Sequence, residues 1–542
     1  MEKIKNPGVY IVEENAFPSS VVEVATAIPA FIGYTEKIPA AGADGLLRIS
    51  SLREFERWFG GPADYRFRIR KATGEGDKSR SEADKKEERG EKLAKFDMHL
   101  NLIGDKEAYY VSRVGTVFRL YEAMRFFFQN GGGACYIISV GDYKDQIRDE
   151  RLADGLRRLE NEPEPTLVLL PDAVSLDTAE AFYSLCRKEI AHCGQMGNRM
   201  AILDVYQGYK AFQNPAGEKS VVDRFREGVG TESLSYAAAY YPWLETTIVQ
   251  ESELSFQNLT DDSLALLVEM ISGELALTDH PENELESEAV RKERVLSMVK
   301  QLPDYTSAVV NSWDDDQDTF GKLSPANLHR TLLAMSQSYK ALMGLLQKYL
   351  NQLPPAAAMA GLYTLVDSTS GVWKAPANLS LNSVMAPSVP ISTEEQEYLN
   401  TPLDGKAVNA IRSFIGEGVL VWGARTLDGN SNEWRYIHVR RTVMVLEQSM
   451  LAAVKAYTFE PNQAATWITV KSMLENYLTQ QWKMGALVGA SPLEAFSVRV
   501  GLGETMTDED IQSGIMRVSA SVAVNRPAEF IEISFAQPMQ KT

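Results

Sequence analysis

Three apolar strands separated by two helical segments most strongly limit how this chain can fold. The apolar runs cover residues 134–140, 166–170 and 199–205, and helical spacing covers 149–160 and 177–193. Continuous apolar strands that alternate with helices are typical of a mainly parallel sheet covered on both faces. The sequence therefore predicts an α/β fold for the central part of the chain.

Other segments extend this pattern. We expect a further strand over 235–241, an amphipathic helix over 116–129 that stops at the following glycines, and one long helix over 328–350. Residues 48–61 are expected to form a strand and a short helix with a serine at its start and a glycine at its end.

The length of 542 residues predicts several domains, because single hydrophobic cores stop growing at about 250–300 residues. We expect an N-terminal β arm over 1–20, an α/β core over 21–430 and a C-terminal domain over 431–542. Charged insertions are expected near 62–100 and 254–325. Between residues 71 and 92, no apolar residue is larger than alanine, so this part should lie in solvent on the outer surface.

The last hundred residues are expected to form a helix over 439–457, a second over 464–482, a short helix and then two strands. From Gly514 to Phe535, apolar and polar residues alternate with the period of a half-buried strand. The chain also opens on a strand over 9–14. Terminal strands are edges that their own domain must cover or another molecule must pair, which favours a polymer subunit over an enzyme.

The expected strands at the two ends of the chain supply the expected contacts between subunits. Their apolar and aromatic members are Val9, Tyr10, Ile11, Val12, Val518, Val522, Val524, Phe530, Ile531 and Ile533.

Charge and composition exclude several classes of partner. The net charge of −18 argues against nucleic-acid binding and against direct binding to an anionic membrane.

No secretory signal is evident, because Pro7, Gly8, Glu13 and Glu14 interrupt the first residues. We therefore expect the protein to be made and retained in the cytoplasm unless it leaves by lysis or inside a particle.

Candidate sites for chemistry are weak. Cys186 and Cys193 lie on one expected helix, roughly 10 Å apart, which is too far for a disulfide, and core packing is their expected role. The glycines at 131–133 run from helix into strand, the reverse of a dinucleotide loop. The acidic run at 314–318 lacks the glycine of a calcium loop. We expect no catalytic residue, metal or cofactor, although an α/β hydrolase-like enzyme with an added C-terminal domain stays an alternative.

Nine short motifs follow one another in an order found in a known family. They lie at residues 6–14, 24–33, 126–136, 240–243, 371–378, 421–426, 439–441, 459–462 and 525–530. Through these motifs the chain resembles the tail sheath proteins of contractile phages and phage-tail-like injection systems. The resemblance covers most of the chain but leaves out the two charged insertions.

The resemblance implies a subtilisin-like α/β middle domain without the protease site, an α+β C-terminal domain, and extended arms that pair with neighbouring subunits. It implies a structural subunit, and no enzyme, in a helical homopolymer with hexameric rings around an inner tube. Contraction of this sheath would drive the tube through a target envelope. Baseplate and cap proteins would be further partners, and the assembled particle could be released from the cell.

The resemblance also places a helix of the C-terminal domain against the tube. In the helix expected over 464–482, Trp467, Val470, Leu474 and Leu478 share one stripe by three-and-four spacing. The opposite stripe is small or polar and is the expected tube-facing surface: Thr469, Ser472, Asn476, Thr479 and Lys483.

Overall fold

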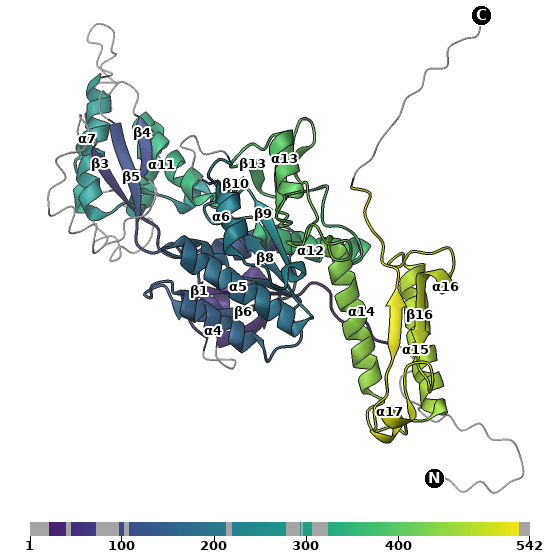
Figure 1. Cartoon of the computed structure of the whole chain (residues 1–542). Coiled ribbons are helices and arrows are strands. Elements are labelled where there is room, and N and C mark those ends of the chain that lie inside the picture. Colours follow the sequence, from purple (N-terminus) through teal and green to yellow (C-terminus); the bar gives the residue numbers. More distant parts are fainter. Residues whose placement is uncertain are drawn as a thin grey trace, which may run out of the picture.

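The computed structural model describes most of the chain as three modules: a central body, an insertion module and a C-terminal module (Figure 1). The residues it describes are 21–39, 45–71, 97–101, 108–212, 219–277, 293, 296–305 and 323–529. The expected strand over 9–14, the residues between 72 and 96, and the acidic run at 314–318 lie outside these ranges.

A nine-stranded sheet forms the centre of the body. Its central strands, from β14 to β6, run parallel, and antiparallel strands close both edges. In spatial order the strands are β12 (Leu379–Ser380), β15 (Gly418–Val421), β14 (Asn409–Phe414), β9 (Ala237–Tyr241), β8 (Met200–Asp204), β7 (Leu167–Leu169), β1 (Pro29–Thr35), β6 (Cys135–Asp142) and β2 (Leu46–Ile49). The predicted, mainly parallel α/β fold is confirmed.

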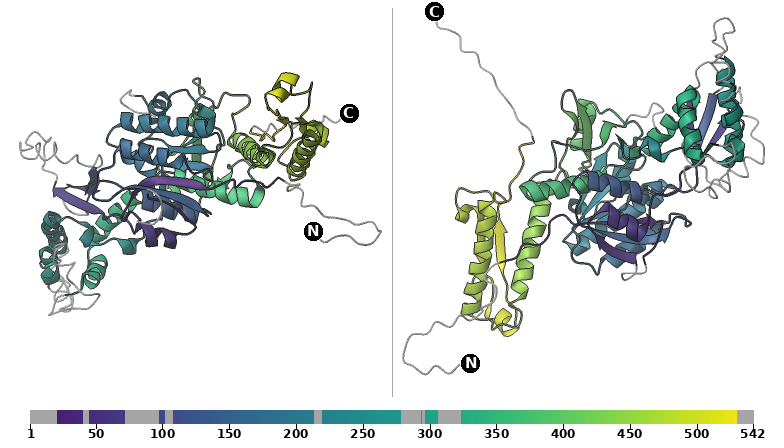
Figure 2. Two further views of the ribbon diagram at one scale, coloured as in Figure 1. Left: turned by 90° about the horizontal axis from the view of Figure 1, so that it is seen from below. Right: turned by 180° about the vertical axis from the view of Figure 1, so that it is seen from behind.

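Helices cover both faces of this sheet (Figure 2). On one face lie α4 (Asp149–Leu159), α5 (Ala179–Met196) and α6 (Val221–Gly228); on the other lie α1 (Leu52–Phe59), α3 (Leu120–Gln129) and α12 (Ala356–Ser370). Strand β1 shows why both faces are apolar. Ala30 and Ile32 belong to the first core and Phe31 to the second, because successive side chains of a strand point to opposite faces. Cys186 and Cys193 are buried, unpaired members of the first core, as predicted.

Local signals in the sequence explain where α1 begins and where α1 and α3 end. The side chain of Ser51 accepts a hydrogen bond from the backbone N–H of Glu54 at the start of α1, and Gly60 ends the helix with a φ of +90°. Helix α3 stops at Asn130 before the predicted glycines, and Gly131 has a φ of +92°. The predicted signals at both ends of α1 and at the end of α3 are confirmed, whereas α3 begins at Leu120 and not at residue 116.

Two distant parts of the chain form the insertion module. Its three-stranded sheet has the order β3 (Arg66–Lys71), β5 (Ala108–Val114) and β4 (Asp97–Asn101), and its helices include α7 (Asp261–Leu277), α10 (Pro325–Met335) and α11 (Gln337–Leu350). Side chains from both parts, such as Phe67, Val111, Leu267 and Leu342, share one apolar core. The described residues of the two expected insertions therefore fold together.

The prediction of a single helix over 328–350 was wrong, because Ser336 divides it into α10 and α11. The backbone of Ser336 is extended, and its hydroxyl accepts a hydrogen bond from the N–H of Tyr339 while donating to Glu274. A serine that caps a new helix in this way competes with continuation of the old one.

Short elements complete the body and its junction with the insertion module. A small sheet joins β11 (Gln352–Leu353), β10 (Leu244–Thr246) and β13 (Val384–Pro387), and α13 (Thr393–Asn400) packs near β14. The 3-10 turns are η2 (Pro171–Ser175), η3 (Leu234–Tyr236), η4 (Glu251–Glu253), η5 (Phe256–Asn258) and η6 (Leu302–Asp304).

The C-terminal module lies on the side of the body opposite the insertion module (Figure 1). Its elements are α14 (Ile437–Lys455), α15 (Ala464–Lys483), α16 (Pro492–Ala495), β16 (Phe496–Arg499), α17 (Asp508–Gln512) and β17 (Ser519–Val522). The two long helices and the strand within 514–535 are confirmed. The expected order was wrong in one respect, because β16 precedes α17 and does not follow all the helices.

Helix α14 connects this module to the body. Ile437 and Met444, in its first part, belong to a core of the body, and Leu446 belongs to the core of the C-terminal module. One helix that contributes to two cores couples their packing. Among the described helices, none has both the length and the apolar character needed to cross a bilayer.

Candidate functional site

The candidate site is the two-stranded sheet of the C-terminal module. Strands β16 and β17 pair antiparallel, with Phe496 opposite Val522 and Val498 opposite Ala520. No other strand within the described ranges pairs with the outer edge of either, although Leu487 bridges to Val524 just past β17. Free strand edges carry unpaired N–H and C=O groups, which pair readily with an added strand.

One face of this sheet packs on the core of the module. Val518, Val522 and Val524 are half-buried against it, as the predicted alternation requires, while Arg517 is exposed. Ala520 was expected on the inner side but is exposed. The inner side of β17 is therefore apolar. A strand added beside it would place its own inner side chains next to these valines and bury them as well.

The N-terminal end of the described chain lies on the same module. Val21 packs against its core, and the backbone N–H of Val24 donates to the hydroxyl of Ser449 on α14 at 3.1 Å. From α15, Gln481 donates to the carboxylate of Glu23 at 3.2 Å. The arm residues Val9, Tyr10, Ile11 and Val12 lie outside the described ranges, directly upstream of this anchor.

The C-terminal end of the described chain is held by the body. Arg425 donates from Nε and Nη2 to the two carboxylate oxygens of Glu529, at 2.8 and 2.6 Å. Asn400 and Tyr436 also donate to Glu529, at 2.7 and 2.9 Å. Burial by itself raises the pKa of Glu529, but these hydrogen bonds outweigh it, so the pKa is lowered. Phe530, Ile531 and Ile533 follow this anchor and lie outside the described ranges.

Helix α15 has the two faces that the sequence predicted. Val470, Leu474 and Leu478 are buried, and Trp467 is half-buried with its indole N–H bonded to Asn462. On the opposite stripe, Thr479 is half-buried, and its hydroxyl donates to the carbonyl of Glu475. The other four members are exposed: Thr469, Ser472, Asn476 and Lys483.

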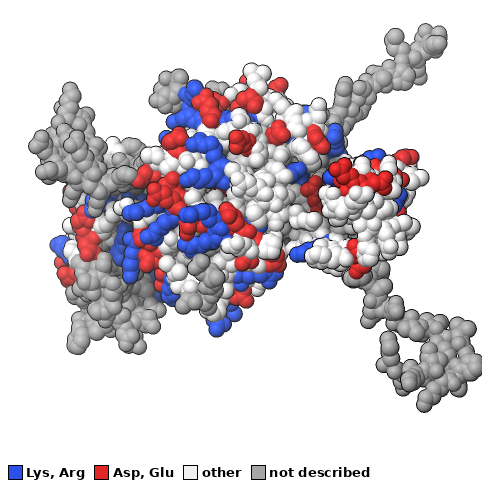
Figure 3. Space-filling view, turned by 60° about the horizontal axis from the view of Figure 1, so that its bottom comes forward, with Lys and Arg blue, Asp and Glu red and all other residues white. Residues whose placement is uncertain are grey.

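An apolar residue on this exposed face was missed. Ile468 is 66% exposed and precedes Ser472 and Asn476 by four and eight positions, so the three share one side of the helix. The same spacing in the sequence could have revealed it. In Figure 3 the C-terminal module, at the right, shows a broad area of uncharged side chains, while basic and acidic groups mix over the body.

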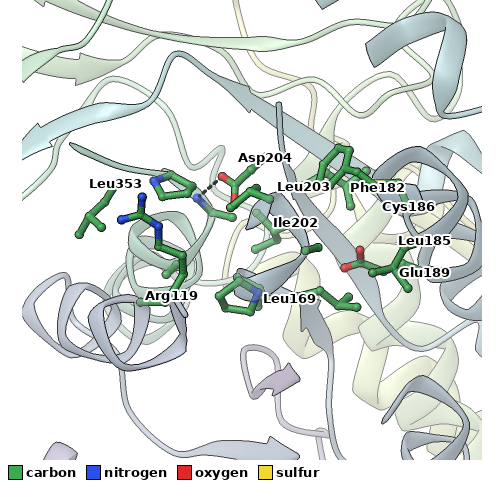
Figure 4. Close-up of a pocket in the computed structure, with 18 of the residues that line it drawn as sticks. Arg119, Leu169, Phe182, Leu185, Cys186, Glu189, Ile202, Leu203, Asp204 and Leu353 are labelled. Carbon is green, nitrogen blue, oxygen red and sulfur yellow. Dashed lines mark hydrogen bonds between the residues drawn. The ribbon is translucent and has the colours of Figure 1, made fainter. Parts of the chain in front are cut away.

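The body contains a small pocket at the carboxyl ends of β7 and β8, where α/β folds often bind ligands. Figure 4 shows Arg119 at one end of the pocket, Glu189 at the other, and Asp204 between them. Its volume is about 30 Å³ and its lining is mainly apolar. The carboxylate of Asp204 accepts a hydrogen bond from the backbone N–H of Ala356 at 2.8 Å, which caps α12.

The pocket does not have the arrangement of a hydrolase. Burial raises the pKa of the Cys186 thiol well above its usual value, which disfavours the reactive thiolate. The described histidine side chains are engaged elsewhere: His192 contacts Arg199, His329 contacts Tyr339, and His438 contacts the carbonyl of Asn525. None of these three contacts is with a serine, so they do not supply the pairing of a base with a nucleophile.

Buried carboxyl groups in the body make its stability depend on pH. Burial raises the pKa of Glu122 to about 8, of Asp204 to about 7 and of Asp172 to about 6. A group whose pKa is higher in the folded state contributes most below its unfolded pKa, about 4 for a carboxyl, and this contribution is lost as pH rises through the folded value.

We therefore expect Glu122→Gln to reduce the loss of stability between about pH 4 and pH 8, because glutamine stays neutral and its oxygen still accepts from the hydroxyl of Tyr65. Urea unfolding at pH 5, 7 and 9 measures this, with the exposed Glu447→Gln as the control. Parallel pH profiles for wild type and Glu122→Gln would contradict the expectation.

The C-terminal module is similar to a known protein family. Residues 430–537 match the family described as Phage tail sheath C-terminal domain. The tail sheath protein of Vibrio phage KVP40 is 25% identical over 135 residues, which are 25% of this chain and 20% of that protein. The match thus spans about a fifth of the length of that curated relative.

Solved structures extend the similarity to the whole chain. The anti-feeding prophage (AFP) helical sheath in its contracted state is 25% identical, with a TM-score of 0.56 over 99% of this chain and 100% of that one. The AFP baseplate structure gives 25% identity and 0.54 over the same shares. The PVC sheath complex in its contracted state, 23% identical with a TM-score of 0.57 over 99% of each chain, supports the fold.

These findings confirm the resemblance predicted from the sequence. The C-terminal segment matches the phage tail sheath C-terminal domain family, and the chain as a whole is similar to the sheaths of contractile injection systems. The comparisons do not support the alternative of an α/β hydrolase-like enzyme.

Proposed function

We propose that this chain is the structural subunit of a contractile sheath. It polymerises helically around an inner tube and contracts to drive the tube through a target envelope. The main support for this proposal is the sheet of β16 and β17, which lies within the segment that matches the sheath family. In the described chain, the outer edges of this sheet have no partner strand. Similarity to the AFP helical sheath over nearly the whole chain supports the same function.

The body serves as a subtilisin-like scaffold without a protease site. Its parallel strands and two helical layers support this assignment, as do the side chains of His192, His329 and His438, whose hydrogen bonds go to Arg199, Tyr339 and the carbonyl of Asn525. We keep the division into an arm over 1–20, an α/β core over 21–430 with the insertion module, and a C-terminal domain over 431–542. This assignment makes the subunit a structural protein whose energy for contraction comes from assembly.

The arms link one subunit to the next. Residues 9–12 of one copy, and 530–533 of another, add to the open edges of β16 and β17. Main-chain hydrogen bonds contribute about 0.5–1.5 kcal/mol each, and the half-buried Val518, Val522 and Val524 supply an apolar surface. Anchors at Ser449 and Arg425 set where each arm leaves its own subunit.

The exposed face of α15 contacts the inner tube. Its polar members, with Ile468 beside them, form contacts that set register yet release when the tube slides, since exposed polar contacts are worth about 0–1 kcal/mol each. We expect Asn476→Glu combined with Lys483→Glu to weaken assembly on the tube protein without unfolding the subunit. Co-sedimentation with the tube protein measures this.

A matched control keeps this test specific. Glu433→Lys changes the charge of another exposed residue of the chain and should leave co-sedimentation unchanged. If the α15 double variant co-assembles as well as wild type, another element must contact the tube, and the loop before Met506 is the next candidate.

The remaining partners and the location follow from this role. The subunit assembles in the cytoplasm as hexameric rings on a baseplate, is closed by cap proteins, and then forms part of a phage tail or a released phage-tail-like particle. The description of similar chains as a helical sheath and as part of a baseplate structure supports the helical assembly and the baseplate among these partners.

Electron microscopy of the purified protein tests the function. We expect tubes or stacked rings, because assembly is an intrinsic property of a sheath subunit. Monodisperse monomers that stay monomeric with the tube protein present would contradict the proposal.

A further inference from the structure

A second pocket of the body lies just past the carboxyl end of β8, between the first turns of α5 and α6. Its volume is about 190 Å³, far above the roughly 10–15 Å³ that one water needs. The carboxyl end of a parallel sheet is where α/β folds bind ligands. The residues that line the pocket are Ala179 and Tyr183 of α5, Tyr206 and Gln207 after β8, and Val221 and Arg224 of α6.

Two helices begin at this pocket. Ala179 is the first residue of α5, and Val221 is the first residue of α6. The first N–H groups of a helix have no acceptor within the helix, and the helix dipole makes this end partially positive. Two such ends on one pocket favour a negatively charged group between them.

The hydroxyl of Tyr183 is a buried group without a partner. The residue is 7% exposed, and its ring packs against Phe182, Tyr206 and Phe225. In the described part of the chain this hydroxyl makes no hydrogen bond, although Tyr183 lines the pocket. Burial raises the pKa of Tyr183 to about 12, and the nearby charge of Arg224 opposes this rise. The hydroxyl is therefore protonated at neutral pH and free to donate to a ligand.

Arg224 supplies the positive charge of the pocket. Its half-buried side chain forms no ion pair with a described residue. The acids in the first turns of the two helices are engaged elsewhere. Glu180 pairs with Arg187 at 3.1 Å, and Asp223 accepts from the hydroxyl of Tyr398 at 2.6 Å. Among the described residues that line the pocket none is acidic, so the charge of the guanidinium is not balanced within it.

The backbone beside the pocket is strained at Gln207. Its φ of +55° lies in the left-handed region, which residues other than glycine seldom occupy. Such conformations cluster at sites that bind ligands, where the surrounding structure holds them. Here the conformation places an amide side chain on the wall of the pocket, and this amide can donate a further hydrogen bond.

We propose that this pocket binds a phosphate group, either as inorganic phosphate or as part of a small phosphomonoester. The guanidinium of Arg224 supplies the two-pronged contact with which arginine binds phosphate. The hydroxyl of Tyr183, the amide of Gln207 and the first N–H groups of α5 and α6 donate to the remaining oxygens. The bound group thereby joins the starts of two helices that cover the same face of the sheet. This site is independent of the proposed sheath function.

Isothermal titration calorimetry of the full-length chain with sodium phosphate, at constant ionic strength, tests the site. We expect saturable binding by wild type and an affinity at least about tenfold lower in Arg224→Met. Arg157→Met is the control, because it removes the same charge from an exposed position on α4 and should bind as wild type does. No saturable binding by wild type up to about 10 mM phosphate, or equal affinities of wild type and Arg224→Met, would overturn the proposal.

A second variant keeps the test independent of folding. Tyr183→Phe retains the ring in the core and removes only the hydroxyl, so it should stay folded and bind phosphate several-fold more weakly. Phenyl phosphate, used as a second probe, distinguishes the two sources of the phosphate group. Tighter binding of phenyl phosphate than of inorganic phosphate would identify a phosphomonoester, and weaker binding would identify the free ion. Unchanged affinity of Tyr183→Phe for both probes would also overturn the proposal.

Discussion

Deleting residues 1–16 is expected to leave a folded subunit that does not polymerise. The apolar cores of the body and the C-terminal module are built from residues from Val21 onward in the described chain, so the deletion removes no observed core contact. It does remove the strand proposed to pair with a neighbour. Several main-chain hydrogen bonds at about 0.5–1.5 kcal/mol each, together with the burial of Val9 and Ile11, amount to a link of several kcal/mol.

Sedimentation velocity and electron microscopy measure this effect, and circular dichroism checks that the subunit is folded. A point substitution sharpens the test, because Tyr10→Pro removes one N–H from the added strand while Tyr10→Ala retains it. We expect the proline variant to assemble much less well than the alanine variant. Normal sheaths from the truncated chain would refute the role of this arm.

Replacing Asp367 by alanine is expected to lower the free energy of unfolding by about 3–5 kcal/mol, because it leaves a buried guanidinium without its partner. Arg441 on α14 donates to both oxygens of Asp367 on α12, at 2.9 and 2.5 Å, and both side chains are 3% exposed. Arg441 also donates to the carbonyl of Thr26 at 3.0 Å. The pair thus joins the body, the connecting helix and the N-terminal segment.

Chemical denaturation of each variant measures this loss. The control is Asp510→Ala, which removes the surface ion pair with the exposed Arg517 together with the hydrogen bonds that Asp510 accepts from Thr507, and it should cost clearly less. Replacing both partners, with Arg441→Met and Asp367→Leu, should recover much of the loss, because no charge is then left buried alone. A cost for Asp367→Ala no larger than for the control would show that the pair does not stabilise this junction.

The elements that could be predicted are those with strong local signals. Apolar runs gave β6, β7 and β8, and helical spacing gave α4, α5, α14 and α15 close to their observed bounds. The half-buried valines of β17 and the two faces of α15 also follow from periodicity. In each case the burial of one face is encoded in neighbouring residues.

The features that could not be predicted depend on distant contacts. Residues 356–363 of α12 are all buried, so this alanine-rich part of the helix has no polar face to reveal its period. The insertion module joins residues around Phe67 to residues around Leu342, and no local pattern shows that they share a core. The ion pair of Arg425 with Glu529 likewise connects residues that are 104 positions apart.

A helical reconstruction of the assembled sheath would show directly whether the arms join neighbouring subunits. We expect the map to contain, beside the outer edges of β16 and β17, added strands that trace to residues 9–12 and 530–533 of neighbouring subunits. A polymer in which both edges of this sheet stay unpaired, with subunits joined only through other surfaces, would contradict this expectation.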